Sequence, residues 1–138
     1  MRTREDIEAY LSRSGHPHRE VAEDTWLVSD PSDDRDHIVV RATEGLVIFR
    51  LKVLELATVS AENRAPLFEA LLRLNAADMV HGAYGIAGED LVMIATLRLE
   101  HLDFNEFSGT LDDFSIALTN HYPQLRDLVS VSTVPESA

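Results

Sequence analysis

The stretch 46–56 constrains the fold most, because its side chains alternate strictly between two kinds of environment. One set of alternate residues is wholly apolar: Val47, Phe49, Leu51 and Val53. The other set mixes apolar and basic side chains: Ile48, Arg50, Lys52 and Leu54. A period of two is the signature of a β-strand with one buried face. The segment is therefore predicted to be a long strand with its apolar set toward the core.

The remaining patterns place helices and strands around this strand. Thr3 can cap a helix that stops at Ser14-Gly15. Strands are expected at 21–29, 37–43, 83–87 and 91–100, where β-prone residues are bounded by turn signals. A helix is expected at 63–77, with Pro66 in its first turn, and a longer one from Asp103, which Pro123 should kink or split. The resulting order, α-β-β-β-α-β-β-α, predicts an α+β fold with a largely antiparallel sheet covered by helices.

Length and charge narrow the function classes. The 138 residues fit one domain, expected over residues 1–130, followed by a flexible C-terminal tail over residues 131–138. A net charge of −12 disfavours nucleic acid and anionic membranes as partners. The absence of cysteine excludes disulfides and thiolate metal sites, and no apolar run is long enough to span a bilayer. These features, with an N-terminus unlike an export signal, predict a cytoplasmic protein.

Three local motifs resemble a known family. They are Leu71-Leu72-Arg73-Leu74-Asn75, His81-Gly82-Ala83-Tyr84-Gly85 and the stretch at 97–107 (LRLEHLDFNEF). With the element order, they resemble the YbjN family and the type III secretion chaperone-like fold over essentially the whole chain. The resemblance implies a helix-covered antiparallel sheet, frequent dimerisation, and the holding of a partner polypeptide or secreted client in extended form. It supplies no catalytic residues.

Motifs that could carry chemistry have simpler explanations here. His16-Pro17-His18 is interpreted as a solvated linker rather than a metal site, and the acidic segment 30–36 as an electronegative loop, because it lacks the glycine and glutamate of a calcium-binding loop. Asp112 and Asp113 are adjacent, so on a helix they point about 100° apart. His121 is predicted to be a buried, hydrogen-bonded histidine. We expect no catalytic site, no metal and no cofactor, and so not an enzyme.

The mixed face of the predicted sheet is the candidate binding surface. If the two hairpins join in one sheet, one outward face gathers six residues: Ile48, Arg50, Lys52, Ile94, Thr96 and Arg98. An amphipathic, locally basic surface suits an extended polypeptide. The competing interpretation is that the Arg and Lys stems only cover a solvent-facing sheet.

Two further hypotheses concern what else the chain binds. The alternative function is a regulator that senses a small molecule in a pocket between helix and sheet. A homodimer is expected, with the surplus apolar side chains Phe104, Phe107 and Leu111 as its interface.

Overall fold

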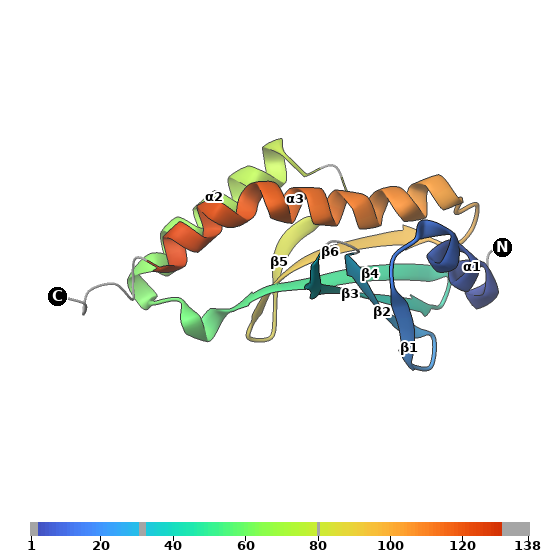
Figure 1. Cartoon of the computed structure of the whole chain (residues 1–138). Coiled ribbons are helices and arrows are strands. Elements are labelled where there is room, and N and C mark those ends of the chain that lie inside the picture. The colour runs from blue at the N-terminus through green and yellow to red at the C-terminus, as the bar shows by residue number, and fades with distance from the viewer. Residues whose placement is uncertain (1–2, 31–32, 80, 131–138) are drawn as a thin grey trace.

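The computed structural model describes residues 3–30, 33–79 and 81–130, and the predicted tail at 131–138 lies outside them. Within these residues three helices and a six-stranded sheet follow the order α-β-β-β-β-α-β-β-α (Figure 1). The elements are α1 (Arg4–Ser14), β1 (His18–Ala22), β2 (Thr25–Asp30), β3 (Asp33–Thr43), β4 (Leu46–Glu55), a short 3-10 turn (Leu56–Thr58), α2 (Ala61–Ala77), β5 (Ala83–Ala87), β6 (Asp90–Arg98) and α3 (Phe104–Ser130). The α+β class is as predicted.

All strand pairs in the sheet are antiparallel, and the order across it is β1-β2-β3-β4-β6-β5. The two hairpins predicted from the sequence therefore join where β4 pairs with β6. In Figure 1, α2 and α3 lie along the same side of the sheet, with α1 near the end that holds the N-terminus. One face of the sheet is covered by helices, and the other is left uncovered by them.

The sheet has one strand more than predicted. The stretch expected as a single strand at 21–29 is instead a hairpin of β1 and β2, which turns at Glu23 and Asp24. Asp24 adopts φ 54°, a left-handed conformation that Asp tolerates better than most residues. Every residue of β1 is exposed. An edge strand without a buried face leaves no alternation in the sequence, which is why the pattern did not reveal it.

Both proline-containing helices differ from the prediction in their bounds. Helix α2 begins at Ala61, so Pro66 lies in its second turn rather than its first. Helix α3 is continuous from Phe104 to Ser130 and is not split at Pro123. Leu118 before the proline is 8% exposed and Leu125 after it is fully buried. Core packing on both sides of Pro123 keeps the helix continuous despite the cost of the missing hydrogen bond.

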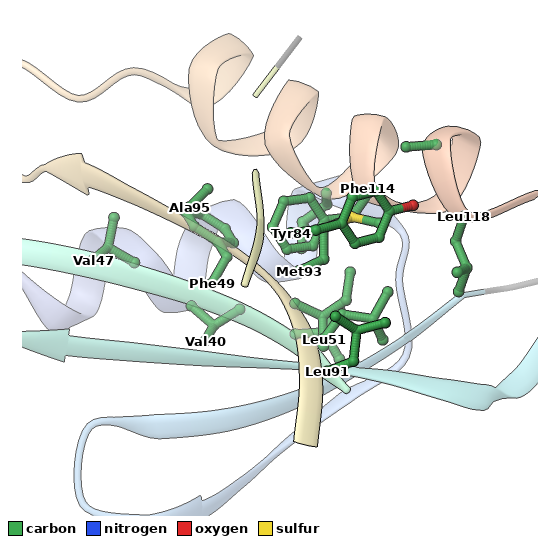
Figure 2. Packing of buried hydrophobic residues seen from close by; sticks show 14 of the residues in the cluster. Val40, Val47, Phe49, Leu51, Tyr84, Leu91, Met93, Ala95, Phe114 and Leu118 are labelled. Atoms are coloured by element: carbon green, nitrogen blue, oxygen red, sulfur yellow. The ribbon is translucent and has the colours of Figure 1, made fainter. Parts of the chain in front are cut away.

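The core lies between the helices and the face of β4 predicted to be buried. Val47 and Phe49 are fully buried and Leu51 is 2% exposed, which confirms the choice of face. Figure 2 shows Phe49 and Leu51 of the sheet on the side toward Phe114 of α3. The ring of Phe49 lies 5.2 Å from that of Phe107 and 6.4 Å from that of Phe114, centroid to centroid. Such aromatic contacts add to the area they bury, so α3 is anchored directly over the sheet's centre.

Candidate functional site

The six residues predicted as a binding surface do share one face of adjacent strands. In the β4–β6 register, Ile48 lies opposite Thr96 and Arg50 lies opposite Ile94. Arg98 lies opposite Leu46, and Lys52 lies opposite Val92. Ile48 and Ile94 are half-buried, whereas Arg50, Lys52, Thr96 and Arg98 are exposed. We call these six residues the outer face. Their proximity is a structural fact, and their role in binding stays a prediction.

Lys52 contributes less positive charge to the outer face than its sequence suggests. Its ammonium Nζ lies 2.8 Å from Glu55 Oε2 and 3.8 Å from Asp90 Oδ1. The hydrogen bond to Glu55 is the main cause that raises the pKa of Lys52, and the same bond lowers the pKa of Glu55. The lysine is thus neutralised within its own chain. The positive charge free to meet a partner comes from arginine.

A hollow of about 580 Å³ adjoins the outer face on the side of β1 to β3. Ile48 and Arg50 line it, together with residues that the sequence prediction missed: Ala22, Glu23, Thr25, Val39 and Arg41. Val39 lies opposite Arg50 and Arg41 opposite Ile48 across the β3–β4 pair. The two-residue turn at Glu44-Gly45 fixes this register. Counting back from that turn would have found both residues.

The predicted dimer interface is wrong. Phe107 and Leu111 are fully buried in the chain's own core, so they cannot meet a second copy. Phe104 is covered by α1: its ring lies 5.9 Å from the ring of Tyr10, and the guanidinium carbon of Arg13 lies 4.1 Å above it. The apolar surface that the sequence analysis assigned to a dimer interface is instead buried where α3 packs against α1 and the sheet.

An open apolar groove lies instead between α2 and the edge strand β5. Its volume is about 290 Å³, and it is lined mainly by apolar side chains: Phe68, Leu71, Leu72, Asn75, Tyr84, Gly85, Ile86 and Leu91. Leu72 is 68% exposed and Ile86 is 55% exposed, unusually high for large aliphatic side chains. This groove stands where the sequence hypothesis expected a pocket between helix and sheet. We call Phe68, Leu72 and Ile86 the edge patch.

Asn75 bonds the backbone of the edge strand beside this patch. Its side-chain oxygen accepts a hydrogen bond from the Tyr84 N–H at 2.7 Å, and its amide nitrogen donates to the Tyr84 carbonyl at 3.2 Å. Because β5 is an edge strand, the polar groups of Tyr84 that Asn75 holds are those that face away from β6. The amide of Asn75 thus stands where a further strand would pair.

Two of the described histidines, His16 and His121, are buried and hydrogen-bonded. His16 is 9% exposed, its ring Nδ1 lies 3.1 Å from the Ser29 carbonyl, and its Nε2 lies 3.6 Å from Asp112 Oδ1. The prediction of a solvated linker is therefore wrong for His16. The buried, hydrogen-bonded state predicted for His121 is confirmed, since it is 5% exposed and its Nδ1 lies 2.8 Å from the Tyr84 hydroxyl.

The paired carboxylates on α3 diverge as expected. Asp112 faces His16, whereas Asp113 is paired with His81 in the segment before β5. Within the part of the chain that the structure describes, no group of three or more His, Asp or Glu side chains is placed to hold a metal ion. Of the acidic segment, residues 31–32 lie outside the described residues, and its later part belongs to β3 rather than to a loop. Among the described helices, none is long and apolar enough to cross a bilayer.

Comparison with solved structures finds the same fold in proteins of low sequence identity. A chain of the heterodimeric ExoU–SpcU complex from the type III secretion system of Pseudomonas aeruginosa superposes with TM-score 0.62 at 18% identity, over 88% of this chain and 96% of that one. A chain of the ExsC–ExsE complex gives 0.62 at 13% identity, over 93% and 97%. YbjN from E. coli gives 0.63 at 13% identity, over 88% and 92%.

Sequence comparison extends the assignment from fold to family. No curated protein matches the sequence. The family model described as CesT_Tir_1 matches residues 1–131, nearly the whole chain. This agrees with the resemblance carried by the motifs at 71–75, 81–85 and 97–107. The chain belongs to the CesT_Tir_1 family of type III secretion chaperone-like proteins, with YbjN among its structural neighbours.

Proposed function

We propose that this protein is a non-catalytic, chaperone-like module that holds a partner polypeptide on the outer face of its sheet. The observation that carries the proposal is the open hollow of about 580 Å³ beside Ile48 and Arg50, on the side of the sheet opposite α2 and α3. Two of the structural neighbours were solved as complexes, ExoU–SpcU and ExsC–ExsE, which supports a partner-binding role. The cytoplasmic location stays a prediction.

The chemistry of the outer face fits a polypeptide better than a small molecule. Ile48 and Ile94 offer half-buried aliphatic surface, and Arg50 and Arg98 extend beside them. An extended segment can place apolar side chains on the former and polar ones on the latter at the two-residue period of a strand. The opposing interpretation, arginine stems covering a solvent face, predicts that nothing binds there.

The test is capture of partners by two tagged variants of equal charge change. Ile48→Asp with Arg50→Glu alters the outer face, and Ile116→Asp with Arg126→Glu alters exposed positions of α3. Each is used, with the native chain, to capture proteins from the cells in which it is naturally made. We expect one abundant polypeptide to be lost with the first variant only. Retention of every partner by a folded outer-face variant would refute this proposal.

We further propose a homodimer in which a second copy covers the edge patch. Leu72 and Ile86 are both more than half exposed, and exposing such large aliphatic side chains to water is unfavourable for a monomer. Strand β5 beside them carries no charged residue that would prevent association at this edge. Leu72→Asp is expected to give a monomer by light scattering at a concentration where the native chain is dimeric. Ile116→Asp, at another exposed aliphatic position, on α3, should leave the dimer intact.

The alternative function, a regulator that senses a small molecule, would be favoured if the light-scattering experiment found no dimer. A native chain that is monomeric at high concentration would leave the groove between α2 and β5 uncovered. A metabolite library that then raised the thermal midpoint of the native chain, but not of Leu72→Asp, would favour ligand sensing over dimerisation.

A further inference from the structure

Two arginines and two aliphatic side chains form a checkerboard on the floor of the hollow. Across the β3–β4 pair, Arg41 stands opposite Ile48, and Val39 stands opposite Arg50. Cross-strand partners share a face of the sheet, so the two guanidinium groups occupy one diagonal and the two aliphatic chains the other. Both arginines are exposed, and both aliphatic chains are half-buried.

Among the side chains that the structure describes, none neutralises these two arginines. With the side chains that the structure describes, neither Arg41 nor Arg50 forms an ion pair, whereas Lys52 in the next row is bound to Glu55 and Asp90. Diagonal neighbours on a sheet lie roughly 7–8 Å apart, within about one Debye length at physiological salt. Their charges therefore repel each other, and a carboxylate placed between them would relieve that repulsion.

These two positive charges stand on a molecule whose net charge is negative. The chain carries 24 acidic and 12 basic residues, a net charge of −12. Glu23 also lines the hollow, from the turn between β1 and β2. Two guanidinium groups against one carboxylate still leave the hollow locally positive on a negative molecule. Such a local reversal discriminates between partners by charge more than it adds affinity.

We infer that the partner segment is acidic and amphipathic, with carboxylates that meet Arg41 and Arg50 and an aliphatic side chain that packs on Val39 and Ile48. This inference rests on the proposed function, and it names the chemistry of the partner and adds Arg41 and Val39 to the surface. The fit requires carboxylates and aliphatic side chains at close spacing. It excludes a basic segment, which the overall charge alone would favour.

Three synthetic decapeptides test the inference: leucine alternating with glutamate, with glutamine, or with lysine. Each is titrated into the full-length, ¹⁵N-labelled protein, and amide shifts report both affinity and location. Two exposed ion pairs predict that the glutamate peptide binds at the hollow about 2- to 30-fold more tightly than the glutamine peptide. Raising the salt concentration should erode this ratio. The lysine peptide should bind the hollow least, although the net charge attracts it.

Variants link the preference to the two arginines. Arg41→Glu with Arg50→Glu should reverse the order, so that the lysine peptide becomes the tightest at the hollow. Arg41→Gln with Arg50→Gln, which adds no new charge, should abolish the difference between glutamate and glutamine peptides and serves if the reversal prevents folding. Arg73→Glu with Arg126→Glu changes the charge equally on the helices and should preserve the native order.

The outcomes distinguish loss of the acidic partner from loss of binding at the outer face. Equal affinity of glutamate and glutamine peptides at the hollow would overturn the acidic partner while leaving sheet-face binding in place. Shifts confined to other surfaces, or no binding by any of the three peptides, would overturn the outer-face proposal together with this inference.

Discussion

Replacing Asn75 with alanine tests how the edge of the sheet is held. The substitution removes both hydrogen bonds to the Tyr84 backbone, one at 2.7 Å and one at 3.2 Å. A typical intramolecular hydrogen bond contributes about 0.5–1.5 kcal/mol net, so the expected loss in free energy of unfolding is about 1–3 kcal/mol. Alanine has a higher helix propensity than asparagine, and this difference offsets the loss by roughly half a kcal/mol.

The assay is urea unfolding combined with hydrogen exchange. With an m-value of about 2 kcal/mol/M, this net loss of about 0.5–2.5 kcal/mol should lower the midpoint by about 0.25–1.25 M. Asn120→Ala, at an exposed position of α3, makes the same change in helix propensity without touching the sheet and is the matched control. In the Asn75 variant the Tyr84 amide should also exchange faster, because its acceptor is gone. The amides that pair β4 with β6 should keep their protection. An unchanged midpoint with a still-protected Tyr84 amide would refute the reasoning.

Two glycine substitutions and one pH series provide further tests. Gly82→Ala should lower the free energy of unfolding by about 1–3 kcal/mol, because Gly82 has φ +80° and an added Cβ would lie 2.5 Å from the Ile94 carbonyl oxygen. At Gly109 an added Cβ meets nothing within 4 Å. Gly109→Ala should therefore raise the free energy of unfolding by about 0.5–1 kcal/mol in the same urea measurement. Burial raises the pKa of Tyr84 to about 12, so folding favours the neutral phenol. That stabilisation is fully present below pH 10 and declines as the pH rises toward 12, by about 2–3 kcal/mol. Unfolding curves of the native chain and Tyr84→Phe should converge over this range, and a constant difference would contradict the assignment.

The core could be predicted from the sequence because a strand with a period-two pattern can face the core in only two ways. Facing Val47, Phe49 and Leu51 outward would have buried Arg50 and Lys52 without partners, at a prohibitive cost. Strand β1 escaped prediction for the opposite reason, since all five of its residues are exposed and none had to be apolar. The failed dimer interface shows a third limit. Whether Phe107 faces solvent depends on Phe49, which is 58 residues away in the sequence, and a single helix pattern cannot report that contact.

The candidate site was predictable to the extent that register was predictable. The joining of β4 and β6 brought the six predicted residues together. The prediction missed Val39 and Arg41 because it considered only those two strands. The short turn at Glu44-Gly45 already set the positions of both residues. The burial of His16 could not be predicted from the sequence, because it depends on the Ser29 carbonyl in β2 and the Asp112 carboxylate on α3.

The two surfaces proposed for binding lie on opposite sides of the sheet, and Asn75 determines how the edge between them can be used. Ile86 faces the helices and belongs to the edge patch, whereas Arg50 faces the opposite side. At the edge, an incoming strand would need the N–H and carbonyl of Tyr84, and Asn75 already binds both. A blocked edge is a common protection against uncontrolled strand pairing. In the proposed homodimer, we therefore expect association at β5 to proceed through the side chains of the edge patch, which would leave the outer face free for a partner while a second copy is bound.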